Sequence, residues 1–315
     1  MIVTVTLNAA IDKTLICHRV ESGGITRAEE ALAVAGGKGI NVARTVFKLG
    51  GKAFATGLAG GSNGALIRDL LKQEKIDYHF VELSANSRMC LTIIEKSAQV
   101  ISEIYDPSPV VQPEEWDNFK QFMSELAKKA DLITINGSLP AGLSATAYGE
   151  LIFLLKKANE RCKVILDTSG PALQKGVEAK PYMIKPNQEE MEILLGHSLS
   201  KREDQIKAVK TFLGEGIEVV VLSLGDQGVV FGYNQAVYGI APLAVTVKST
   251  VGCGDALVGG FAHRLLEKGD VIEAVKYGVA SATSNLTTKT QGDVSRTQVE
   301  EFLRLIKLSP VGSET

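Results

Sequence analysis

Cysteine is scarce in this sequence: the 315 residues include four, and no two of them form a CxxC pair. Since no histidine stands nearby at a metal-ligand interval, they predict no zinc site, and reduced cytosolic thiols are expected. An apolar run of roughly 20 residues, as a membrane helix needs, is also missing. The N-terminus, MIVTVTLNAAID, lacks a charged region before an apolar one and is typical of a first strand, not a signal peptide. A cytoplasmic protein without a membrane partner is expected.

The sequence also lacks an excess of charge of one sign. Lys plus Arg number 34 against 36 for Asp plus Glu, so the net charge of −2 provides no global field for attracting nucleic acid. Apolar residues make up 45% and charged residues 22%, which argues against a disordered or collagen-like chain. A folded protein with no nucleic-acid partner is expected, and any anionic ligand must be met by local groups.

Glycine, by contrast, is frequent, and its 31 residues cluster between apolar runs and helical patterns. Short continuous apolar runs are typical of parallel strands that helices cover on both faces. Such runs begin at Asp131, Lys163, Pro181 and Val219. Helical patterns alternate with them, so a mostly parallel α/β sheet is predicted from about residue 130 to 235. No linker or internal repeat divides the chain, and a single domain is expected over residues 1–315.

The N-terminal half contains alternating segments without helical crossovers between them. Those around residues 12–35 and 88–106 predict a small separate sheet embedded in the larger domain. Its connections through Asp12 and the turn at Gly36 and Gly37 would place this sheet over a ligand site as a lid. An exposed apolar face on the lid predicts a homodimer formed through it.

The first glycine-rich motif is AGGKGINVA, from Ala35 to Ala43. Apolar residues follow at helical spacing, so a helix is predicted to begin at the glycines. Free N–H groups at that helix N-terminus, together with Lys38, suit a polar or anionic ligand. The alternative is a glycine turn before an ordinary amphipathic helix. The motif is not a Walker A loop, because GxxxxGK[ST] is absent.

The second motif is STVGCGDALVGGF, from Ser249 to Phe261, which joins a β-branched run to an apolar helix. The amides of Gly252, Cys253 and Gly254 then form an anion hole suited to a transferring phosphoryl group. The carboxylate of Asp255 can accept a proton from an attacking hydroxyl, although a helix N-cap is the alternative. A dinucleotide fingerprint is excluded, because GxGxxG requires glycine where Leu257 stands.

Together the two motifs resemble the signature regions of the PfkB carbohydrate kinase branch of the ribokinase-like family. TLNAAID, NGSLP, KPNQEE and SLGDQG follow in the family's order, and the resemblance covers about residues 2 to 308. It implies a three-layer α/β/α core with a mostly parallel central sheet and a small β-sheet lid. It also implies a kinase that uses ATP and magnesium.

Carried over position by position, the resemblance makes Asp255 the catalytic base and the amides at 252–254 the hole for the γ-phosphate. Cys253 stands where the family usually has Ala, and is expected to be a small buried group. The implied sugar ligands are Asp12, Gly37, Lys38 and Asn41. The implied nucleotide ligands are Lys185, Asn187, Ser223, Gly225 and Gly228. Glu190, with Asn187, would organise magnesium through water and phosphates, although this pair can equally cap a helix.

The acceptor is expected to carry a phosphate already, which requires further cations. Arg27, Arg88 and Ser138 occur in segments that resemble hexose-phosphate kinases, and arginine suits phosphate through its planar fork of donors. A solvated surface arginine is the alternative for Arg27 and Arg88. The opening TLNAAID is similar to that of 1-phosphofructokinases and tagatose-6-phosphate kinases, with Ala9 in place of proline. The residues do not decide between these two activities. Fructose 1-phosphate is the expected acceptor because its kinases are the more widespread, with tagatose 6-phosphate as the alternative.

Other functions are less favoured by these residues. A 6-phosphofructokinase is a further alternative, and Arg27 and Arg88 argue against a plain sugar or nucleoside kinase. A non-catalytic sugar- or nucleotide-binding protein of the same fold is a different class of function, and Asp255 argues against it.

Overall fold

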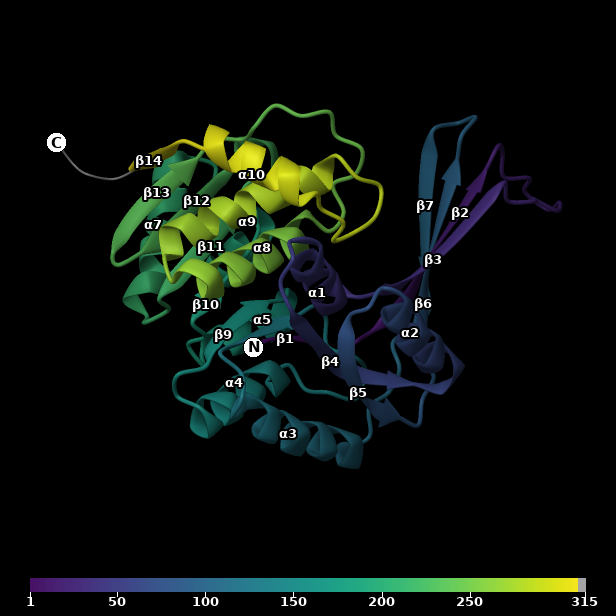
Figure 1. Cartoon of the computed structure of the whole chain (residues 1–315), viewed down its shortest axis with the longest axis horizontal. Coiled ribbons are helices and arrows are strands. Elements are labelled where there is room, and N and C mark those ends of the chain that lie inside the picture. The colour runs from purple at the N-terminus through teal and green to yellow at the C-terminus, as the bar shows by residue number, and fades with distance from the viewer. Residues whose placement is uncertain (311–315) are drawn as a thin grey trace.

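The computed structural model describes residues 1–310 and contains two sheets of unequal size (Figure 1). Within these residues the larger sheet has ten strands in the order β14-β13-β12-β11-β10-β9-β8-β1-β4-β5. Its strands are β1 Ile2–Thr6, β4 Ala53–Gly60, β5 Asp77–Leu83, β8 Leu132–Asn136, β9 Lys163–Asp167, β10 Met183–Ile184, β11 Val219–Ser223, β12 Val229–Tyr233, β13 Ala236–Ile240 and β14 Leu308–Pro310.

The strands from β5 to β11 pair in parallel, and β12, β13 and β14 add an antiparallel edge. This confirms the predicted mostly parallel sheet. The alternation of strand and helix ends at β11, because the chain reverses at Gly228. A φ of 86° and a Cβ position only 2.1 Å from the Ile240 carbonyl oxygen make glycine necessary at that turn.

Helices cover both faces of the large sheet and complete three layers. One face packs against α1 Lys38–Lys48, α2 Gly61–Gln73, α8 Cys253–Lys268, α9 Val271–Leu286 and α10 Arg296–Leu305. The other packs against α3 Pro113–Ala127, α4 Ala147–Ala158, α5 Gly170–Val177, α6 Gln188–Leu195 and α7 Arg202–Gly214. Successive strand residues alternate between the two cores, as Leu132 and Ile133 do. The apolar runs of the sequence are continuous because both faces are covered.

The small sheet projects from the body of the molecule (Figure 1) and has the strand order β3-β2-β6-β7. Its strands are β2 Ala10–Cys17, β3 Glu30–Gly36, β6 Arg88–Glu95 and β7 Val100–Tyr105. At its base Ala10 pairs with both Gly36 and Arg88. We call this sheet the lid. Its exposed apolar side chains include Leu32, Val100, Ile101 and Ile104.

Two expectations from the composition can be checked against residues 1–310. All four cysteines are free thiols. No helix in the described part of the chain combines the length and the apolar character needed to cross a bilayer.

Candidate active site

Helix α8 begins at the second glycine motif. Gly252 is its N-cap, with a left-handed φ of 83°, and a Cβ there would lie 3.0 Å from Gln291 Cα. The amides of Cys253 and Gly254 follow at the open end of the helix. Asp255 lies in the first turn, is 5% exposed and does not cap the helix. The N-cap interpretation of this aspartate is therefore wrong.

The surroundings of Asp255 change the pKa of its carboxyl group. Burial, reinforced by the charge of Asp167, raises its pKa to about 7, although the Lys38 and Lys185 ammonium groups oppose the shift. The side-chain amide of Asn41 also favours the carboxylate, because its Nδ2 donates to Asp255 Oδ2 at 2.8 Å. A carboxyl group with a pKa near neutrality is suited to accept and release a proton.

A buried carboxylate anchors two lysines beside this helix end. Asp167, at the end of β9, lies 3.2 Å from Lys185 Nζ and 3.7 Å from Lys38 Nζ through its Oδ1 atom. Burial opposes its ionisation, but the two ammonium groups outweigh burial and hold the pKa of Asp167 below its usual value. The Asp167 carboxylate raises the pKa of Lys38 in turn. A Cβ on Gly254 would lie 3.1 Å from Lys185 Nζ, so this cation borders the predicted anion hole.

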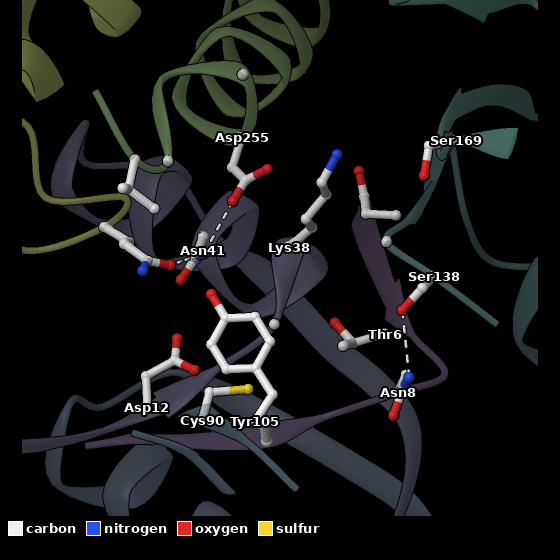
Figure 2. A pocket seen from close by; sticks show the side chains of 18 of the residues that line it. Thr6, Asn8, Asp12, Lys38, Asn41, Cys90, Tyr105, Ser138, Ser169 and Asp255 are labelled. Carbon is white, nitrogen blue, oxygen red and sulfur yellow. Dashed lines mark hydrogen bonds between the residues drawn. The ribbon is translucent and has the colours of Figure 1, made fainter. Parts of the chain in front are cut away.

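A polar cavity of about 490 Å³ opens in front of Asp255, between the large sheet and the lid (Figure 2). Six of the predicted acceptor residues line it, namely Asp12, Gly37, Lys38, Asn41, Arg88 and Ser138. Gly252, Gly254, Lys185, Asn187, Glu190 and Ser223 line it as well. In Figure 2 the ring of Tyr105 from the lid points into the same space.

Asp12 lies at the base of the lid, and its carboxyl group occupies the space that a side chain on Gly36 would fill. A Cβ on Gly36 would lie 2.2 Å from Asp12 Cγ, so only glycine fits there. Burial raises the pKa of Asp12 to about 6, and the charges of Arg44 and Arg88 limit the rise.

Several polar atoms in the wall of the polar cavity have no partner within residues 1–310. Among the described residues Arg88 Nε, Thr6 Oγ1 and Asn8 Oδ1 are buried without a hydrogen-bond partner. Buried polar groups are rarely left in this state, so the cavity is suited to a polar ligand.

A second cavity, of about 660 Å³, lies on the other side of the α8 N-terminus and is mainly apolar. Its apolar wall includes Leu243, Val247, Leu257, Val279 and Leu286. Gly225, Gly228 and Ser223 from the predicted nucleotide set also line it. The two cavities share Asn187, Ser223 and Gly254, so they meet at the predicted anion hole.

Cys253 faces the apolar cavity. Its Sγ atom accepts a hydrogen bond from Asn285 Nδ2 at 3.5 Å, and burial raises its pKa above the usual value. The thiol is therefore protonated near neutral pH and occupies its place as a small neutral group.

Asn187 and Glu190 form the capping box of α6. Asn187 Oδ1 accepts from Glu190 N at 2.8 Å, and Glu190 Oε2 accepts from Asn187 N at 2.9 Å. The capping interpretation is thus correct for these contacts. Both side chains also line the polar cavity, and Glu190 Oε1 accepts no hydrogen bond within residues 1–310. One such oxygen with an amide fits a magnesium ion that keeps most of its waters.

Comparison with known proteins decides the family. The model of the pfkB family carbohydrate kinases matches residues 5–297. The chain belongs to this family. It is a carbohydrate kinase with the ribokinase-like fold expected from its motifs.

Solved structures of related proteins match over nearly the whole kinase chain. Phosphofructokinase-2 from Escherichia coli in complex with potassium is 27% identical with a TM-score of 0.90, and covers 96% of this chain and 98% of its own. The same enzyme in complex with fructose-6-phosphate is 27% identical with a TM-score of 0.88, at 96% and 98% coverage. A protein described as a possible 1-phosphofructokinase from Thermotoga maritima is 25% identical with a TM-score of 0.88, at 99% coverage of both chains.

Arg27 is the predicted acceptor residue that the kinase chain does not bring to the polar cavity. It lies in the exposed loop between β2 and β3, and it lines neither cavity. The register explains why: Ala10 and Gly36 pair at the cavity, whereas Ile16 and Glu30 pair at the outer end. Six residues of strand separate the two ends by about 20 Å. Within one chain the expected cluster of Arg27 with Arg88 is therefore not formed.

Among the polar residues in or beside the kinase site that were not predicted, three have a clear structural role. Asp167 ends a buried apolar run, and ligands of parallel sheets bind at carboxyl ends of strands, so that position was a usable signal. Gln291 touches Asn41 from a distant loop, with its Oε1 accepting from Asn41 Nδ2 at 3.0 Å. Arg44 follows the first glycine motif but carries no motif of its own. For the last two we find no signal in the sequence.

Proposed function

We propose that this kinase transfers the γ-phosphate of ATP to a hydroxyl group of a ketohexose phosphate. Fructose 1-phosphate is the leading acceptor, which would yield fructose 1,6-bisphosphate. One observation carries the proposal: a polar and an apolar cavity meet at Gly254 in the first turn of α8, and the carboxylate of Asp255, the next residue, faces the polar cavity. A transfer reaction between two different substrates needs such a junction.

The apolar cavity is the place for the nucleotide base in this proposal. Gly225 and Gly228 let the backbone approach a ligand closely on the way to the anion hole. There the amides at 252–254 and the Lys185 ammonium would stabilise the negative charge of the transferring group. Asn187 and Glu190 would hold magnesium, which supplies charge neutralisation at the phosphates when bound.

The acceptor occupies the polar cavity, with its reacting hydroxyl beside Asp255. The carboxylate accepts the hydroxyl proton as the new oxygen–phosphorus bond forms. Asp12 accepts hydrogen bonds from neighbouring sugar hydroxyls, because a carboxylate offers strong, directional acceptors. The lid excludes water from the cavity, which protects the transferring phosphoryl group from hydrolysis.

Arg88 is the proposed ligand for the phosphate that the acceptor already carries. Its side chain lines the polar cavity, and its buried Nε donor has no partner among the described residues. The hydroxyl of Ser138, which accepts from Asn8 Nδ2 at 3.2 Å, lines the same cavity. A planar guanidinium and a hydroxyl suit the oxygens of a phosphate.

Tagatose 6-phosphate is the alternative acceptor, on the opening TLNAAID segment. Fructose 6-phosphate is a further candidate, because the E. coli relative was solved with it. ADP release measured with ATP and magnesium against these three, unphosphorylated hexoses and nucleosides tests the proposal. Preference for fructose 1-phosphate supports it, and preference for another ketohexose phosphate moves the acceptor within the class. Turnover of unphosphorylated acceptors alone would contradict the phosphate site but not the kinase.

We also propose a homodimer formed through the lid. The exposed apolar residues Leu32, Val100, Ile101 and Ile104 lie on this small sheet, and β7 has an unpaired edge. Light scattering at micromolar concentration is expected to give twice the monomer mass, and Ile101→Lys with Ile104→Lys is expected to reduce it. A monomer mass for the unaltered protein would contradict the dimer.

A further inference from the structure

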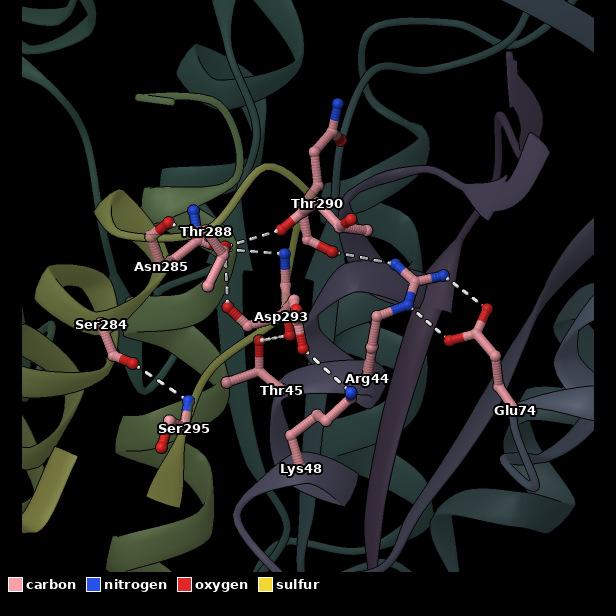
Figure 3. Close-up of polar contacts among 12 residues, drawn as sticks. Arg44, Thr45, Lys48, Glu74, Ser284, Asn285, Thr288, Thr290, Asp293 and Ser295 are labelled. Carbon is pink, nitrogen blue, oxygen red and sulfur yellow. Dashed lines mark hydrogen bonds and ion pairs between the residues drawn. The ribbon is translucent and has the colours of Figure 1, made fainter. Parts of the chain in front are cut away.

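Arg44 lies in α1 one turn beyond Asn41, and only 3% of its side chain is exposed. All five of its N–H donors have acceptors. Nε and Nη2 donate to the two carboxylate oxygens of Glu74 at 2.5 and 2.8 Å. Nη2 also donates to Ala35 O at 2.7 Å, and Nη1 donates to Asn41 Oδ1 at 2.8 Å and to Gln291 O at 3.1 Å. Figure 3 shows the pair of bonds to the Glu74 carboxylate, and together the five bonds hold the guanidinium in one orientation.

The side-chain amide of Asn41 also has a hydrogen-bond partner for its oxygen and for both of its N–H groups. Its Oδ1 atom accepts from Arg44, and its Nδ2 group donates one proton to Asp255 Oδ2 at 2.8 Å and the other to Gln291 Oε1 at 3.0 Å. In the flipped amide the oxygen would face the oxygens of Asp255 and Gln291, and the NH₂ group would face the Arg44 cation. All three contacts would then be repulsive, so Arg44 selects the orientation in which Asn41 donates to Asp255.

We propose that Arg44 is a positioning residue for the phosphoryl transfer, which acts through the side-chain amide of Asn41 on the carboxylate of Asp255. The inference rests on the proposed role of Asp255 as the base. Arg44 does not line the polar cavity, so it has no direct contact with a substrate there. Besides Asn41, its acceptors belong to the lid strand β3, to the C-cap residue of α2 and to the loop that carries Gln291. These anchors fix the amide relative to both the lid and the anion hole.

The planar fork of arginine is essential to this role. Two donors must reach the Glu74 carboxylate while others point to Asn41, Ala35 and Gln291, and the three donors of a lysine cannot serve five bonds. Glu74 neutralises the buried cation but does not touch Asn41. Substitution of either residue therefore disturbs the same ion pair. Only a substitution of Arg44 also removes the hydrogen bond to the side-chain amide of Asn41.

The test compares Arg44→Lys with Glu74→Gln as its matched control. We expect Arg44→Lys to lower kcat by about 10-fold to 100-fold, since small displacements of a catalytic group have effects of that size. The KM for ATP is expected to stay within about threefold, because Arg44 does not line the apolar cavity. Glu74→Gln is expected to lower the melting temperature similarly but to keep kcat within about threefold. Equal losses of kcat in both variants would overturn the proposal.

A double-mutant cycle with Asn41→Ala separates positioning from general stability. If Arg44 acts through Asn41, Arg44→Lys has little further effect on kcat once Asn41→Ala is present. Effects that multiply would show that Arg44 acts by another route and would overturn the inference. If Arg44→Lys does not fold, hydrogen exchange of the Asn41 side-chain amide in the unaltered protein decides. Slow exchange supports a held amide, and exchange at the rate of an exposed asparagine contradicts it.

The outcome also separates this inference from the proposed function. An inactive Asp255→Asn variant with a fully active Arg44→Lys variant would contradict the role of Arg44 alone. An active Asp255→Asn variant would contradict the proposed base and, with it, the inference about Arg44.

Discussion

The two cavities that meet at the N-terminus of α8 differ in the polarity and charge of the side chains that line them and in the elements that supply these side chains. The polar cavity is surrounded by ionisable groups such as Asp12, Lys38, Arg88 and Asp255, and one wall comes from the lid. The apolar cavity is lined mainly by aliphatic side chains from the C-terminal half, including Leu257 and Val279. One side is therefore suited to a highly hydroxylated, charged molecule, and the other to a flat ring system.

The difference shows how the fold divides its tasks. Burial near charges in the polar cavity moves the pKa values of Asp12 and Asp255 towards neutrality, which prepares carboxyl groups for proton transfer. The apolar cavity provides shape and contact area, mainly through aliphatic side chains. Substitutions in the polar cavity should therefore alter the chemical step and the binding of the acceptor. Substitutions in the apolar cavity should alter only the binding of the nucleotide.

Removal of the charge of Asp255 should give the largest effect. Asp255→Asn keeps the shape of the side chain but cannot accept the proton, so kcat is expected to fall by about 10²-fold to 10⁴-fold. Steady-state ADP release measures it, with circular dichroism as the control for folding. A kcat within tenfold of the unaltered protein would mean that another group is the base.

The pH dependence of kcat/KM tests the role of the titrating carboxyl groups in the polar cavity and has the next largest expected effect. Because burial raises the pKa of Asp255 to about 7, the protonated, inactive form increases as the pH falls below that value. We expect kcat/KM for the acceptor to be level above pH 7 and to fall about tenfold per unit below it, with a second contribution from Asp12 near 6. A rate that stays level down to pH 5 would contradict these raised values.

Arg88 tests the acceptor side of the comparison. Arg88→Ala removes a cation from the polar cavity, and bonds to charged groups contribute about 1.5–3 kcal/mol. The KM for the phosphorylated acceptor is expected to rise by about 10-fold to 100-fold, while the KM for ATP changes little. An unchanged acceptor KM would remove Arg88 from the phosphate site, and an equal rise for both substrates would point to damage beyond it.

Ala282 tests the nucleotide side and has the smallest expected effect. Its side chain lines the apolar cavity, so Ala282→Phe is expected to fill part of the space and raise the KM for ATP by about tenfold. The KM for the acceptor should stay the same. An acceptor KM that rises as well would indicate that the two cavities do not act separately.

Much of the fold could be predicted from local patterns in the sequence. Buried runs at Asp131, Lys163 and Val219 became β8, β9 and β11, because continuous apolar segments are needed between two helical layers. The glycine motifs marked the starts of α1 and α8 correctly. The antiparallel edge of β12, β13 and β14 was not foreseen, since β14 joins it from the far end of the chain.

The site was predictable where a motif carried it and not where distant side chains meet. Asp12, Lys38 and Asp255 lie together as expected, but the partners of Asp167 come from two other segments of the chain. Arg27 and Arg88 look alike in the sequence, yet the strand register separates them along the lid. Register and long-range pairing depend on tertiary packing, which local spacing does not encode.

Titration calorimetry of Asp255→Asn tests the central claim most directly, because it separates binding in the two cavities from the chemistry between them. A non-hydrolysable ATP analogue with magnesium and the preferred ketohexose phosphate are titrated in turn. Both Kd values are predicted to stay within about threefold of those of the unaltered protein, although turnover is lost. Loss of binding of either substrate would contradict the account, because Asp255 would then be a binding group rather than the base beside the junction of the two cavities.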